Sequence, residues 1–113
     1  MKETPFKEKV IEFLKERDIW YVKYWAGSQY TKEGVPDIIA CINGRLHGIE
    51  LKTDAGSESK LQAYNLDKIN QNFGSGYVLR PTEIRPQKYP EFKYDRLTFD
   101  DWVWLYFGDN HAI

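Results

Sequence analysis

The stretch GVPDIIACINGRLHGIELK, residues 34–52, decides the fold. It contains two apolar runs, residues 37–42 and 45–53, with Asn43 and Gly44 between them. An Asn-Gly pair between apolar runs is a strong signal for a two-residue turn that joins antiparallel strands. The stretch therefore predicts a β-hairpin. It also carries ionisable residues, which are costly in a sheet that is covered on both faces unless they are paired.

The register of this hairpin brings two carboxylates together. With a two-residue turn Ile42 faces Arg45, so that five residues further along each strand Asp37 faces Glu50 on one face of the sheet. Their Cβ atoms would be about 4.5–5.5 Å apart, and Lys52 points to the same face. Opposed like charges destabilise a strand pair, whereas a divalent cation such as Mg²⁺ or Mn²⁺ binds such oxygens. The spacing therefore predicts metal-assisted hydrolysis of a phosphodiester, with a surface ion-pair cluster as the alternative.

The rest of the chain predicts an α/β domain. Apolar residues at helical spacing indicate helices, and runs of β-branched and aromatic residues indicate strands. The expected elements are a helix at 5–17, strands at 19–25, 37–42 and 45–53, a helix at about 59–73 and a strand at 76–80. This order favours a mixed central sheet with a helix on each face. The length of 113 residues suits a single domain, with a core at about 5–81 and a C-terminal extension at 82–113.

The C-terminal extension is rich in aromatic residues and has a less regular pattern. Its first part contains several prolines and is expected to be irregular. The later run TFDDWVWLYFG, residues 98–108, predicts a helix, with a short strand as the alternative. Its aromatic side chains are expected to pack on the sheet or on a partner subunit, although they would also be able to stack on unpaired bases.

The composition restricts the possible functions. The formal net charge is −1, so any contact with nucleic acid must come from local basic patches rather than from bulk charge. No stretch approaches the roughly 18 apolar residues of a membrane span. The charged start MKETPFKEK lacks the apolar segment of a secretion signal, so a cytoplasmic location is expected. Cys41, the single cysteine, is expected to be a small buried core residue.

The run Gly34-Val35-Pro36-Asp37, followed by Glu50-Leu51-Lys52, resembles the PD-(D/E)XK nuclease signature. More narrowly, the chain is similar to the VRR-NUC family. That family has a G-x-PD strand, an E-x-K strand, and then a serine and a glutamine that open the next helix, here Ser59 and Gln62. The stretch KYWAGSQYTKEGVPD is similar to the stand-alone members found in phages and prophages. The resemblance implies a restriction-endonuclease-like core with the order α-β-β-β-α-β.

The resemblance also implies a role for each matched residue. Asp37 and Glu50 would bind Mg²⁺ or Mn²⁺, with the backbone carbonyl of Leu51 as a further ligand. Lys52 would position or activate the attacking water and stabilise the pentavalent phosphate. Gln62 would orient water or phosphate from the second helix.

Further contacts are expected outside this set. Related nucleases take an additional acidic residue from the first helix, for which Glu8 and Glu12 are the candidates. Glu12 is preferred because it lies deeper in the helix, and the alternative for both is an exposed helix charge. The candidate DNA contacts are Lys23, Gln29, Lys32 and Ser59. The alternative for Lys23 is a lysine that snorkels out of an edge strand, and the alternative for Gln29 and Lys32 is an exposed polar loop residue without such a contact.

The expected function is therefore a metal-dependent DNA endonuclease. The resemblance implies a phage- or prophage-encoded protein that acts in a bacterial host, as a homodimer, on branched DNA such as a four-way junction. The alternative is a catalytically silent subunit that kept the nuclease fold and serves in nucleic-acid binding or assembly. The complete set of Asp37, Glu50 and Lys52 argues against that alternative, because a silent subunit has no evident use for three costly groups on one face.

Overall fold

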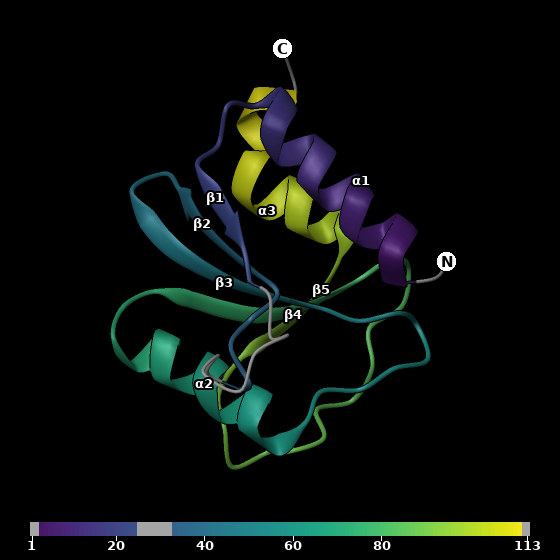
Figure 1. The fold of residues 1–113 in the computed structure, drawn as a ribbon, viewed down its shortest axis with the longest axis vertical. Coiled ribbons are helices and arrows are strands. Elements are labelled where there is room, and N and C mark those ends of the chain that lie inside the picture. Colours follow the sequence, from purple (N-terminus) through teal and green to yellow (C-terminus); the bar gives the residue numbers. More distant parts are fainter. Residues whose placement is uncertain (1–2, 25–32, 112–113) are drawn as a thin grey trace.

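A five-stranded sheet lies between helices (Figure 1). The computed structural model describes residues 3–24 and 33–111. In chain order the elements are α1 (Glu3–Glu16), β1 (Tyr21–Lys23), β2 (Ile38–Ile42), β3 (Arg45–Leu51), α2 (Lys60–Gln71), β4 (Ser75–Arg80), β5 (Asp95–Thr98) and α3 (Phe99–His111). Across these two ranges, no helix has the length and apolar character needed to cross a membrane.

The sheet is mixed, and its strands lie in the order in which they occur in the chain. β1, β2 and β3 are antiparallel neighbours, whereas β4 and β5 run parallel to β3. Ile42 pairs with Arg45, so the predicted hairpin and its register are confirmed. Asn43 and Gly44 have φ of 52° and 79°, the positive values that a two-residue hairpin turn needs at both positions.

The helices cover both faces of the sheet. Figure 1 shows α1 and α3 together over one face and α2 over the other. The main core, which includes Leu14, Ile49 and Trp102, lies under α1 and α3, and a smaller cluster around Leu66 lies under α2. At Gly76 of β4 a Cβ atom would be 2.5 Å from the carbonyl oxygen of Leu66, so glycine is what lets α2 approach the sheet this closely.

The C-terminal extension is part of the domain core. Its final run is the predicted helix, α3, and Trp102 and Phe107 of that helix are buried, whereas Trp104 is 73% exposed. The extension also supplies β5, which the sequence did not predict, because the four residues of that strand show no alternation of polar and apolar side chains.

Two local predictions were wrong. Cys41 is exposed rather than buried, because it points away from the α1–α3 face that its neighbours Ala40 and Ile42 fill, and α2 packs mainly on β3 and β4. The first strand has three residues, Tyr21–Lys23, in place of the predicted 19–25, the last residue of which lies outside the described part of the chain.

His47 of β3 has a structural role. Its Nδ1 lies 2.8 Å from the hydroxyl of Tyr77, and the indole of Trp102 donates to the same hydroxyl at 2.7 Å. Burial, together with the positive charge of Arg45, lowers the pKa of His47 to about 4. The imidazole is therefore neutral near pH 7 and joins β3, β4 and α3 within the core.

Candidate functional site

Asp37, Glu50 and Lys52 meet where β2 begins and β3 ends. The N–H of Leu51 donates to Asp37 Oδ2 at 2.9 Å, and Lys52 Nζ lies 3.5 Å from Glu50 Oε2. Glu50 and Lys52 alternate with Ile49 and Leu51, which fill the core under α1 and α3. The hairpin therefore directs the charged side chains to the other face of the sheet and the apolar ones into the core.

The segment that leads into Asp37 is fixed by its neighbours. Gly34 has a φ of 75°, and a Cβ atom there would lie 2.5 Å from Cγ of Leu61 on α2. The side chain of Asn65, also on α2, donates to the Gly34 carbonyl at 2.9 Å. The carbonyl of Asp37 itself accepts from the N–H of Tyr24 at 2.9 Å. These contacts hold Asp37 between β1 and α2.

Glu50 is a buried carboxyl group in an unfavourable place for charge. Its side chain is 1% exposed. Burial, followed by the negative charge of Asp37, raises its pKa to about 9, although Lys52 opposes the shift. Without a bound cation Glu50 is therefore protonated near pH 7, and its contact with Lys52 joins an ammonium to a carboxylic acid. Its Oε1 is buried, with no hydrogen-bond partner among the described residues.

The pair of carboxylates fits a small divalent cation. A buried acceptor without a partner, next to a second carboxylate, gains most from a cation that binds both. Within residues 3–24 and 33–111, no group of three or more His, Cys, Asp or Glu side chains is placed to hold a metal ion. The site thus offers two side-chain ligands, which suits Mg²⁺, since Mg²⁺ often takes one or two carboxylates together with water and phosphate.

The structure does not bring the helix-one glutamates to this pair. Glu8 and Glu12 are exposed on α1, because Val10 and Leu14 form the side of the helix that packs on the sheet. Lys23 is exposed on β1, the edge strand beside β2. Two other candidate DNA contacts, Gln29 and Lys32, lie outside the described residues.

Ser59 and Gln62 form a reciprocal cap at the start of α2. Ser59 Oγ accepts from the N–H of Gln62 at 3.2 Å, and Gln62 Oε1 accepts from the N–H of Ser59 at 2.8 Å. The spacing of serine and glutamine that matches the nuclease pattern is thus also that of a capping box. The predicted role of Gln62 towards water or phosphate stays a prediction.

Sequence reasoning missed a buried polar cluster beside Lys52. Arg80 and Tyr94 both contact Glu58, which lies in the loop that follows β3. The signal in the sequence is weak: Arg80 is a charged residue at the end of an apolar strand, and arginine is usually exposed at such a position. Arg80 is buried through contacts with residues that are distant in the sequence.

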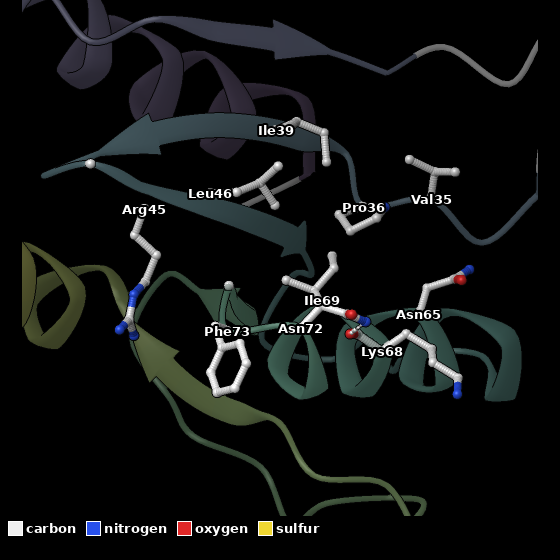
Figure 2. Close-up of a pocket in the computed structure, with 12 residues that line it drawn as sticks. Val35, Pro36, Ile39, Arg45, Leu46, Asn65, Lys68, Ile69, Asn72 and Phe73 are labelled. Carbon is white, nitrogen blue, oxygen red and sulfur yellow. Dashed lines mark hydrogen bonds between the residues drawn. The ribbon is translucent and has the colours of Figure 1, made fainter.

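A groove runs along the same sheet face, next to the carboxylates but separate from them. Figure 2 shows Pro36, Ile39 and Leu46 of the hairpin region facing Ile69 of α2. The volume of about 730 Å³ is within the range of ligand sites. None of the lining residues is acidic, and Asp37, Glu50 and Lys52 are not among them. The predicted metal pair therefore lies outside this groove, at the strand ends, with Glu50 buried and Lys52 partly exposed.

Comparisons of this chain with models of protein families, with curated proteins and with solved structures found no match. The chemistry must therefore be inferred from the residues themselves. The site contains two carboxyl groups and an ammonium, and the partly exposed Lys52 is its contact with solvent. Carboxylates are ligands for a divalent cation, and an ammonium can bind an anionic substrate oxygen.

Proposed function

We propose that this protein is a metal-dependent nuclease that hydrolyses phosphodiester bonds in DNA. The observation that carries the proposal is the buried, unpartnered Oε1 of Glu50 beside Asp37. Burial and the neighbouring Asp37 both disfavour the ionised form of Glu50, and a cation bound between the two carboxylates would offset that cost. The resemblance of the same residues to the PD-(D/E)XK signature supplies the reaction class.

Each residue of the site has a distinct proposed role. Asp37 and Glu50 would hold Mg²⁺ or Mn²⁺, with the Leu51 carbonyl as a further ligand by resemblance. A bound divalent cation lowers the pKa of water and neutralises charge on a phosphate. Glu50 must release its proton before it can act as a ligand, so binding of the cation is coupled to proton release. Lys52 offers an ammonium donor to the scissile phosphate or to the attacking water.

The proposal includes a restriction-endonuclease-like fold. It is supported by the order of α1, three antiparallel strands, α2 and the parallel strand β4, to which β5 and α3 are added. Origin in a phage or prophage, and a cytoplasmic location in a bacterial host, rest on the sequence resemblance alone.

Cleavage of plasmid and linear DNA in Mg²⁺, in Mn²⁺ and in EDTA tests the proposal. Asp37→Asn and Glu50→Gln are each expected to reduce the rate by roughly 100-fold or more, because each removes a ligand charge. Glu91→Gln, at an exposed loop position, is the matched control and should cleave like the wild type. Cleavage in EDTA, or a rate near that of the wild type in either variant of the pair, would contradict the metal site. DNA binding without cleavage by the wild type would instead identify a silent subunit.

We further propose that the active form is a homodimer on branched DNA. A chain with a net charge of −1 has a small basic footprint, and two copies double its phosphate contacts. The exposed Trp104 and Leu105 on α3 provide an apolar surface for such a contact. Light scattering measures the assembly, and a synthetic four-way junction tests the substrate. A monomer that cuts linear duplex as readily as the junction would contradict this part of the proposal.

A further inference from the structure

Arg80 is a buried residue at the end of β4, next to the point where β3 passes into Lys52 and the following loop. β4 pairs with β3 so that Leu79 lies opposite Leu51, and the N–H of Lys52 donates to the Leu79 carbonyl at 3.0 Å. Arg80 follows directly, at the point where β4 ends and β3 has become a loop, and it is 3% exposed. The side chain is thus placed to act on the loop rather than on the strand.

One side chain contacts this loop at three points. Arg80 Nη1 donates to the carbonyl of Thr53 at 2.7 Å and also to the carbonyl of Gly56. Its Nη2 lies 3.7 Å from Oε1 of Glu58. These contacts fix the start, the middle and the end of residues 53–59, the segment that joins Lys52 to the first turn of α2. A planar guanidinium with several donors can bridge these acceptors, which a lysine cannot do.

Tyr94 completes the cluster from the C-terminal extension. Its hydroxyl donates to Oε2 of Glu58, and both residues are buried. Burial, followed by the hydrogen bond to Glu58, raises the pKa of Tyr94, so the hydroxyl remains a donor over the whole range in which the protein would be assayed. Buried ion pairs are often no more stabilising than apolar residues of the same volume, so stability is a weak reason for this cluster.

We propose that Arg80, Glu58 and Tyr94 are positioning residues for Lys52. By fixing the loop that begins directly after Lys52, they keep its ammonium beside Glu50 instead of extended into solvent. They do not contact the candidate metal ligands in the structure, and they act through the loop backbone. The catalytic consequence rests on the proposed nuclease function, whereas the positioning itself does not.

The kinetic test compares two tyrosine variants that each lose one buried hydroxyl. Tyr94→Phe removes the donor to Glu58, and Tyr77→Phe removes a hydroxyl that contacts His47 and Trp102 on the other face of the sheet. At saturating Mg²⁺ and DNA, well below either melting temperature, Tyr94→Phe is expected to lower kcat about tenfold. KM and the calorimetric affinity for Mn²⁺ should not change, because Glu50 lies on β3 and Asp37 is held by the N–H of Leu51 on the same strand, not by the loop. Tyr77→Phe should lose stability but keep its kcat.

A second measurement reports on Lys52 without any reaction on DNA. The metal-free proteins are acylated briefly with an amine-reactive ester, and the modified lysines are quantified by mass spectrometry. The exposed Lys60 is the internal reference. The Lys52 side chain is only 17% exposed in the folded protein, so labelling of its amine relative to Lys60 should rise in Tyr94→Phe and stay at the wild-type level in Tyr77→Phe.

The two measurements separate this inference from the proposed function. If the wild type cleaves no DNA, the nuclease proposal fails, and Lys52 labelling alone decides the positioning. If Tyr94→Phe keeps the wild-type labelling of Lys52, or if Tyr77→Phe raises it equally, the positioning role is wrong and the cluster is structural. If labelling rises but an active enzyme keeps its kcat, the cluster positions Lys52 without an effect on catalysis, and the catalytic part of the inference is overturned.

Discussion

At Glu50 a carboxyl group is enclosed by protein and lies beside Asp37. Its folded pKa of about 9 is above the ordinary 4.5, so between these values the folded protein retains a proton that the unfolded chain releases. The stability of the metal-free protein is therefore complete below pH 4.5 and is lost as the pH rises towards 9, by at most about 1.4 kcal/mol per pH unit from this group. Glu50→Gln should remove this slope. Urea unfolding in EDTA at pH 6, 7.5 and 9 measures it, and parallel curves for the two proteins would contradict the assignment.

Lys52 should be separable from the metal ligands by substitution. An ammonium is a hydrogen-bond donor and cannot coordinate a cation, so Lys52→Ala is expected to lose cleavage by roughly 100-fold while retaining metal affinity. Calorimetry with Mn²⁺ measures the second quantity, and Lys60→Ala is the control for loss of an exposed lysine. A near wild-type rate in Lys52→Ala would leave Lys52 as a structural partner of Glu50.

Phe73 has an unfavourable backbone for its side chain. Its φ is 68°, in the left-handed region, and the residue is 86% exposed at the end of the groove in Figure 2. Such a backbone costs an L-residue about 1–2 kcal/mol, and glycine avoids most of this cost. Phe73→Gly should therefore raise the free energy of unfolding by about 0.5–1 kcal/mol. Phe73→Ala is the control, since alanine removes the ring but keeps the strain. Equal unfolding curves for the two variants would show that strain is not the cause.

Among the elements, the β2–β3 hairpin was the most predictable from sequence. The turn depends only on Asn43 and Gly44 themselves, because both residues adopt positive φ readily. The turn then determines every residue pair of the hairpin, as far as Ile38 opposite Ile49. β5 was not predictable for the opposite reason. Its four residues have no pattern of their own, and its parallel pairing with β4 depends on contacts between distant parts of the chain.

The same distinction applies to the candidate site. The meeting of Asp37, Glu50 and Lys52 follows from the hairpin register and was available from the sequence. The cluster of Arg80 and its partners was not, since it joins three segments that no local rule brings together. The position of Glu12 relative to the site also depends on how α1 lies across the sheet, which the helical pattern of apolar residues does not specify.

At the scale of the whole molecule, the C-terminal extension supplies part of the main core. Phe99, Trp102 and Phe107 of the extension are buried in the main core with residues of α1 and the sheet. Removal of residues 95–113 should therefore abolish cooperative unfolding, because loss of one buried aromatic side chain alone costs about 3–5 kcal/mol. Circular dichroism during thermal unfolding measures this, with removal of residues 112–113 as the control. A truncated protein that keeps a sharp transition would show that the core is complete without the extension.

The late position of β5 in the chain has a consequence during synthesis on the ribosome. Until residues 95–98 have emerged, the nascent chain exposes the unpaired backbone of β4, whose six residues are all buried in the finished protein. An apolar strand with a free edge readily pairs with other chains. The domain therefore completes its folding only once β5 and α3 have been synthesised. Slow translation beyond Pro81 should lengthen the time during which β4 is exposed, and so increase aggregation and the requirement for chaperones.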